Sequence, residues 1–137
     1  MNLENNTILI TGGSSGIGLE LSKALIQKGN NVIICGRSNA KLSEAKRIEP
    51  HLISYQCDLS NSRECTDFSK MISTSHPDLN ILINNAAIVH KTNFLNTDSI
   101  IEMAENEIET NFLAPIRLIH YLYPVLQKNK NSALINI

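Results

Sequence analysis

A short apolar run that stops at a cluster of glycines and serines constrains the fold of this 137-residue chain more than any other feature. The run Ile8-Leu9-Ile10 leads into Thr11-Gly-Gly-Ser-Ser-Gly-Ile-Gly18, and apolar residues then recur at helical spacing, at Ile17, Leu21 and Leu25. The pattern predicts a strand, a tight turn and a helix. Such a unit places backbone N–H groups and a helix N-terminus around a phosphate.

Three glycines of this stretch each have an expected task. Gly12 is expected to adopt left-handed torsions at the end of the strand, and Gly16 to let the backbone approach a pyrophosphate. Gly18 is expected to let the helix pack closely on the strand. The spacing Gly12-x-x-x-Gly16-x-Gly18 differs from the standard G-x-G-x-x-G fingerprint. Together with these glycines, we expect Ser14, Ser15 and Ile17 to line a dinucleotide site.

Short apolar runs alternate with helical periods along nearly the whole chain. We expect strands at about 7–11, 31–36, 52–57, 79–84 and 132–137. We expect helices at about 16–28, 39–48, 61–75 and 97–128, the last of them broken in two near 105–107. Ser38 and Asn61 are placed to cap helix N-termini. The alternation predicts one α/β domain over residues 1–137, a doubly wound parallel sheet of the Rossmann type with strand order 3-2-1-4-5.

Composition excludes several classes of function. The formal net charge is −1, so no basic field indicates a nucleic-acid partner. No apolar run approaches the length that spans a bilayer, and the first residues lack a secretory pattern, so we expect no membrane association and a cytoplasmic location. Three cysteines and four scattered histidines show no metal-ligand spacing, and no metal site is expected. Cys35 and Cys57 each end an apolar run and are expected in the core.

In a doubly wound sheet the ligand lies beyond the carboxyl ends of the strands, so the residues that end each strand are candidates for the site. Arg37 follows the second strand, where an acidic residue would suit NAD and an Arg suits the 2′-phosphate of NADP. No Asp or Glu occurs between residues 30 and 39. The residues favour NADP(H), with NAD(H) as the alternative; a solvated surface Arg is the competing interpretation.

The third and fourth strands end in further candidates. Asp58 can accept from an adenine amino group while Leu59 lines the adenine pocket, although a turn-forming Asp is also common at such a place. After the fourth strand come Asn84-Asn85-Ala86-Ala87. The small residues among these would let a ribose lie against the backbone, and Asn84 can tie neighbouring strands together.

The long predicted helix carries a polar residue beside its apolar stripe. The stripe, expected to be core, consists of Ile108, Phe112, Ile116, Ile119, Leu122 and Leu126. Pro115 lacks the N–H that would bond the carbonyl of Asn111. We therefore expect a kink there and a carbonyl left free for water.

Four stretches together resemble the short-chain dehydrogenase/reductase family: Thr11 to Gly18, Asp58-Leu59, Asn84 to Ala87, and Glu109-Thr110-Asn111-Phe112. The resemblance implies hydride transfer between a nicotinamide and an alcohol or carbonyl substrate. It implies cofactor binding by Gly12, Ser14, Ser15, Gly16, Ile17, Gly18, Arg37, Asp58, Leu59, Asn85, Ala86 and Ala87, and a catalytic Asn111 whose main chain holds a water. Two positions depart from the family pattern: Ala87 stands where Gly is usual, and Ser15 where NADP-preferring members often carry a basic residue.

The family's catalytic Ser and Tyr-x-x-x-Lys have no counterpart in these residues. Four positions after Tyr55, Tyr121 and Tyr123 stand Leu59, Val125 and Gln127. We therefore expect the N-terminal portion of a family member, truncated before the last strands and inactive by itself, and a homo-oligomer because its last strand forms an apolar sheet edge. A non-catalytic dinucleotide-binding module and an inactive remnant are the alternatives.

Overall fold

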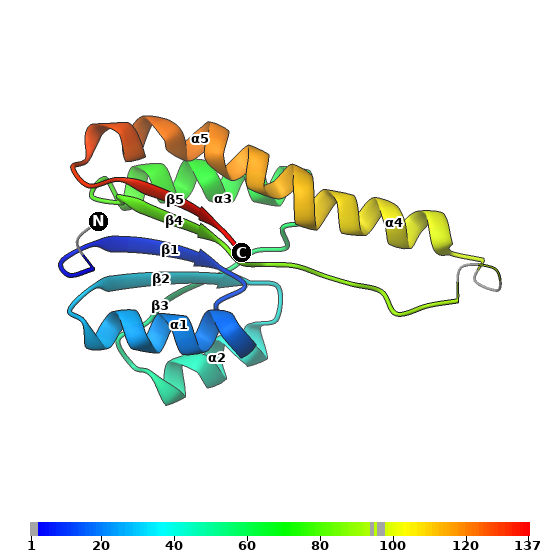
Figure 1. The fold of residues 1–137 in the computed structure, drawn as a ribbon, viewed down its shortest axis with the longest axis horizontal. Coiled ribbons are helices and arrows are strands. Elements are labelled where there is room, and N and C mark those ends of the chain that lie inside the picture. Colours follow the sequence, from blue (N-terminus) through cyan, green and yellow to red (C-terminus); the bar gives the residue numbers. More distant parts are fainter. Residues whose placement is uncertain (1–2, 94, 96–97) are drawn as a thin grey trace.

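A computed structural model describes residues 3–93, 95 and 98–137 and shows a parallel sheet between two layers of helices (Figure 1). The strands are β1 (Thr7–Thr11), β2 (Asn31–Gly36), β3 (Ile53–Gln56), β4 (Ile81–Asn84) and β5 (Ala133–Asn136). The helices are α1 (Gly16–Gln27), α2 (Asn39–Ile48), α3 (Ser62–Ser75), α4 (Ile100–Ile108) and α5 (Ala114–Lys128), with the π-helical turn η2 (Glu109–Leu113) between the last two. The sheet order β3-β2-β1-β4-β5 confirms the predicted topology.

The central strands are buried because helices cover both faces of the sheet. Helices α1 and α2 lie on one face, and α3 and α5 lie on the other (Figure 1). Leu9 pairs in register with Ile33 and Leu82, and all three point into the core beneath α3 and α5. Ile10 and Ile34 point the opposite way, toward α1 and α2. Strands buried on both sides explain the continuous apolar runs in the sequence.

Two helices begin at the predicted caps. The Ser38 hydroxyl accepts a hydrogen bond from the Lys41 N–H at 3.3 Å. The Asn61 side chain accepts from the N–H groups of Arg63 and Glu64, both at 3.1 Å. Both caps satisfy N–H groups that have no acceptor inside the helix, so they fix where α2 and α3 start.

The prediction of a break near residues 105–107 is wrong. Helix α4 continues to Ile108 and passes through η2 into α5 as one long rod (Figure 1). In η2 the Ala114 N–H donates to the Glu109 carbonyl, five residues back, instead of four. A π-helical turn therefore stands where we expected a kink, next to the missing N–H of Pro115. The expected helix start at residue 97 lies outside the described residues.

The expected apolar face of the long helix is only half correct. Ile108, Phe112 and Ile116 are 54%, 62% and 48% exposed. The helix packs on α3 through a face centred on Leu118 and Val125, so Leu122 and Leu126 are buried and Ile119 is partly buried. Within the described parts of the chain, no helix has the length and apolar character that crossing a membrane requires.

Candidate functional site

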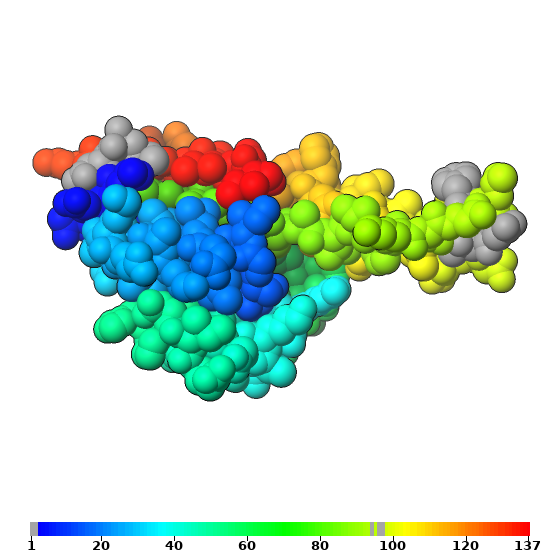
Figure 2. All heavy atoms as spheres, turned by 60° about the horizontal axis from the view of Figure 1, so that its bottom comes forward, coloured from blue at the N-terminus to red at the C-terminus, as the bar shows by residue number. Residues whose placement is uncertain are grey.

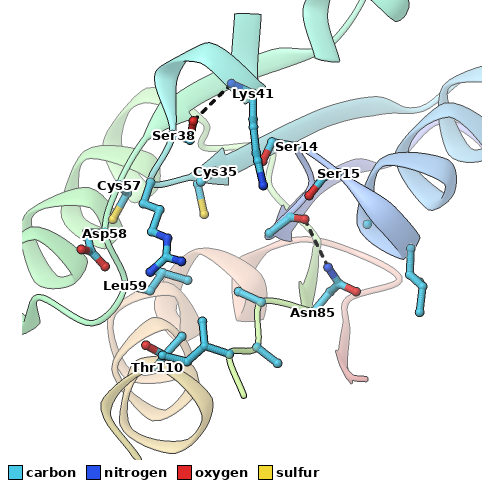
Figure 3. A pocket seen from close by; sticks show the side chains of 18 residues that line it. Ser14, Ser15, Cys35, Ser38, Lys41, Cys57, Asp58, Leu59, Asn85 and Thr110 are labelled. Carbon is cyan, nitrogen blue, oxygen red and sulfur yellow. Dashed lines mark hydrogen bonds between the residues drawn. The ribbon is translucent and has the colours of Figure 1, made fainter. Parts of the chain in front are cut away.

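A cavity of about 390 Å³ opens at the carboxyl ends of β1, β2, β3 and β4 (Figure 3). This is the switch point of the sheet, where β1 pairs with β2 on one side and with β4 on the other. The lining residues are Gly12, Ser14, Ser15, Ile17, Gly18, Cys35, Gly36, Arg37, Ser38, Lys41, Cys57, Asp58, Leu59, Asn85, Ala86, Ala87, Ile88 and Thr110. Of the thirteen residues that the sequence nominated, the cavity brings together all except Gly16 and Asn111.

The glycine-rich turn forms one wall, and the structure leaves no room for a side chain at Gly12 or at Gly18. Gly12 has a φ of +67°, and a Cβ at this position would lie 2.9 Å from the Ala86 Cα. A Cβ at Gly18 would lie 2.6 Å from the Gly12 carbonyl oxygen and 2.5 Å from the Asn85 Nδ2. The absence of side chains at these positions therefore lets α1, β1 and the end of β4 meet closely.

The N-terminus of α1 faces this wall without a side-chain cap. Ser15 precedes the helix in an extended conformation, and its side chain makes no capping hydrogen bond. The first N–H groups of a helix have no acceptor within it. Together with the positive end of the helix dipole, they make this corner suited to an anionic group. Ile17 is exposed and lines the cavity instead of joining the stripe of Leu21 and Leu25.

The β2 side of the cavity holds two basic residues. Arg37 follows β2, and Lys41 lies in the first turn of α2. Figure 3 shows the Lys41 side chain extending into the cavity toward Ser14. Gly36 lets the turn approach, since a Cβ there would lie 3.0 Å from the Ser14 hydroxyl oxygen. Sequence reasoning missed Lys41, although its position four residues after Arg37, in the first turn of a helix, could have indicated it.

The end of β3 supplies a carboxylate and an apolar floor. The Asp58 Oδ1 accepts from the N–H and the hydroxyl of Ser60, at 3.0 and 2.7 Å, so the turn-forming role considered from the sequence is present. Asp58 also lines the cavity, and Leu59 beside it is buried.

Two thiols sit in the same floor. Cys35 and Cys57 are buried as expected, and both reach the cavity lining. Burial raises the pKa of the Cys35 thiol to about 12 and raises that of Cys57 further. Both thiols are therefore protonated at neutral pH and contribute apolar surface, not charge.

The end of β4 is tied to its neighbours by two asparagines. The Asn84 Nδ2 donates to the Asn136 Oδ1 on β5 at 2.9 Å, which confirms the expected link between strands. The Asn85 Nδ2 donates to the Thr11 carbonyl at 3.0 Å, and the Asn85 N–H donates to the Thr11 hydroxyl at the same distance. These bonds hold the following residues, Ala86 and Ala87, at the cavity edge.

Asn111 lies outside the cavity and acts on its edge through the main chain of Ile88. The Asn111 Oδ1 accepts from the Ile88 N–H at 2.9 Å, and its Nδ2 donates to the Ile88 carbonyl at 2.8 Å. The neighbouring Thr110 is buried and lines the cavity. Thr110 and Ile88 were not predicted, because their positions depend on how η2 packs against the chain after β4.

Known proteins are similar to this chain in sequence and in fold. The short chain dehydrogenase family matches residues 6–137. The uncharacterized oxidoreductase DltE of Bacillus subtilis is 42% identical over the full chain, which covers 54% of that relative. A fatty acyl-CoA reductase of Acinetobacter baylyi is 31% identical over 99% of the chain and 48% of its own length. The chain thus spans about half the length of these curated relatives.

Solved structures of short-chain oxidoreductases are similar to this chain in fold. A metagenomic short-chain oxidoreductase in complex with NADP superposes with a TM-score of 0.86 at 28% identity, covering 98% of this chain and 62% of that one. A Pseudomonas aeruginosa RhlG/NADP active-site complex gives 0.84 at 26% identity, covering 98% and 55%. With its fold, its glycine-rich turn and its sequence all in agreement, the chain belongs to the short-chain dehydrogenase family.

Proposed function

We propose that this chain is the cofactor-binding part of an NADP(H)-dependent oxidoreductase that exchanges hydride between the nicotinamide and an alcohol or carbonyl substrate. The observation that carries the choice of NADP(H) is the pair of basic residues, Arg37 and Lys41, on the β2 side of the cavity. The adenosine ribose of a dinucleotide lies beside the residues that follow this strand. Two cations there would bind a 2′-phosphate, which NAD lacks.

The remaining lining residues suit the rest of the cofactor. The uncapped N-terminus of α1 would bind the pyrophosphate, and Leu59 would contact the adenine. Ala86 and Ala87 leave room for the second ribose at the β4 side. NADP(H), when bound, supplies the hydride; the residues of this chain bind and orient it. The two similar structures named above are NADP complexes, which supports the same choice of cofactor.

We propose further that the 137-residue polypeptide binds cofactor without turning over substrate. Protonating the alkoxide that forms on hydride transfer requires a positioned acid, which contributes about 10²–10⁴-fold. None of its three tyrosines is followed by Lys at the fourth position. In the family, Tyr and Lys at that spacing supply the acid. A non-catalytic dinucleotide-binding module is the second candidate, since the cavity lining can hold a cofactor without taking part in the chemistry.

Self-association of this polypeptide is a third proposal. It is supported by the exposed apolar residues of the long helix and by the position of β5 at the edge of the sheet. Ile101, Ile108, Phe112 and Ile116 are exposed along α4, η2 and α5, and Leu134 is exposed on β5. Sedimentation velocity would show a dimer or larger species if this is correct, and a monomer at all concentrations if it is not.

We also propose the cytoplasmic location expected from the sequence. The three cysteines are free and buried, which is typical of proteins in a reducing compartment.

Binding of NADPH and NADH to matched variants tests the cofactor assignment. Arg37→Asp should weaken NADPH binding by roughly tenfold or more and shift the preference toward NADH, because it replaces attraction for the phosphate by repulsion. Lys41→Ala should weaken NADPH binding alone. Lys46→Ala, on the same helix but outside the cavity lining, is the control and should change neither affinity. Unchanged NADPH binding in the Arg37 and Lys41 variants would contradict the assignment.

A further inference from the structure

The chain that follows β4 leaves the sheet as an extended segment and runs beside α4. Figure 1 shows this segment and α4 projecting together from the body of the molecule, and Figure 2 shows them in contact from another side. No strand pairs with residues 87–93 among the described residues. The main-chain groups of this segment therefore find their partners outside the sheet, in water or in the helix.

Two side chains of the long helix supply these partners. Asn111 binds both main-chain groups of Ile88, as described above. One helical turn earlier, the Glu107 Oε1 accepts from the main-chain N–H of His90 at 2.5 Å and lies 3.0 Å from the His90 Nδ1. Asn111 and Glu107 thus bind the extended segment at two points, and we call these two contacts the grip.

The distance between the two contacts along the extended segment matches the distance between them along the helix. Alternate residues of an extended chain direct their N–H groups the same way and lie about 6.6 Å apart. Residues four apart on a helix share a face and are separated by a rise of about 6 Å. Asn111 can therefore bind Ile88 while Glu107 binds His90. Binding at one of these points fixes how the segment is aligned with the helix at the other.

The gripped segment begins at the cavity. Ala86, Ala87 and Ile88 line it on the β4 side. Because the residues after β2 lie beside the adenosine ribose, the nicotinamide half of a dinucleotide would lie toward β4. The position of this edge would then decide how the reactive ring is held.

We propose that Glu107 is a positioning residue for the nicotinamide half of the cofactor, acting through the His90 main chain on Ala87 and Ile88; this role rests on the proposed function. The acceptor is charged: the N–H of His90, and then its ring, hold the pKa of the Glu107 carboxyl below its usual value. A hydrogen bond to an ionised acceptor is stronger than one between neutral groups. Glu107 therefore fixes the second point of the grip, beyond the one made by Asn111.

Hydrogen exchange without cofactor tests the grip. In Glu107→Ala the amides of His90 and Ile88 should exchange faster, by roughly tenfold for His90, because a charge-assisted hydrogen bond is lost. Glu107→Gln keeps an acceptor oxygen and should restore most of the protection. Glu105→Ala removes an exposed carboxylate from the same helix and is the control. Unchanged exchange in Glu107→Ala would overturn the proposal.

Binding of two ligands tests the role at the cofactor. Glu107→Ala should weaken NADPH binding by roughly five- to tenfold and leave the affinity for adenosine 2′,5′-bisphosphate, which lacks the nicotinamide half, unchanged. Glu107→Gln should recover the loss. Equal weakening of both ligands would overturn the positioning role and indicate a general loss of structure. If the unmodified chain binds neither ligand, the proposed function and this role both fail, whereas unchanged exchange with normal NADPH binding refutes only the role of Glu107.

Discussion

Replacing Gly18 by alanine sets two opposite effects against each other. Within a helix, alanine is more stable than glycine by about 0.5–1 kcal/mol. At this position, however, the new Cβ would lie 2.6 Å from the Gly12 carbonyl oxygen and 2.5 Å from the Asn85 Nδ2. The Gly12 oxygen belongs to the main chain, and the Asn85 amide is bonded to the Thr11 carbonyl at 3.0 Å, so neither atom can move freely. Overpacking of this kind costs about 1–3 kcal/mol, so we expect a net loss of about 1–2 kcal/mol.

Urea unfolding followed by far-UV circular dichroism measures this difference. With a slope of about 2 kcal/mol per molar urea, the midpoint of Gly18→Ala should fall by about 0.5–1 M. The loss should be smaller in an Asn85→Ala background, where one of the two clashing groups is absent. A midpoint that stays the same or rises would mean that helix propensity prevails and that α1 does not need this close approach.

Three other substitutions or treatments test the structure at other positions. Asn80→Ala should lower stability by about 1–3 kcal/mol in urea unfolding, because the buried N–H of Thr7 loses its acceptor; a change below 0.5 kcal/mol, roughly that of a surface site, would contradict this. The Arg117 side chain holds the pKa of Glu109 below its usual value, so the pair stabilises the fold above the carboxyl's unfolded pKa and ceases to do so as pH falls through its folded pKa. Arg117→Met should therefore cost about 0.5–1 kcal/mol at pH 7 and less at pH 3, and an equal cost at both would refute the pairing. Cys35 should react with Ellman's reagent only on unfolding, since burial keeps its thiol protonated; rapid labelling of the native protein would show otherwise.

The sheet could be predicted from the sequence because burial on both faces leaves a strong signal. Runs such as Val32-Ile33-Ile34 and Ile81-Leu82-Ile83 fit no other element as well, and β2 and β4 contain them. The caps of α2 and α3 were also predictable, because Ser38 and Asn61 act on N–H groups two or three residues away. Local chemistry of this kind can be read directly from a sequence.

The long helix was harder to predict because its packing is decided by distant neighbours. Spacing alone placed Phe112 and Ile116 in the core, whereas α3 contacts the face around Leu118. The π-helical turn depends on how the backbone accommodates Pro115, which periodicity does not reveal.

The candidate site likewise combines residues that local sequence predicts with residues that only tertiary packing brings into place. Its turn and strand ends could be predicted from motifs. Lys41 enters the cavity from a helix, and Ile88 reaches the lining through a grip by Asn111, so both required the tertiary structure.

The most direct test of the account is calorimetric titration of this chain, confirmed to be folded by circular dichroism, with NADPH and with NADH. The account predicts saturable binding of NADPH, with NADH at least tenfold weaker because it lacks the 2′-phosphate that Arg37 and Lys41 would bind. Equal affinities would contradict the preference for NADP(H). Binding of neither nucleotide by the folded chain would contradict the proposal that this cavity is a cofactor site.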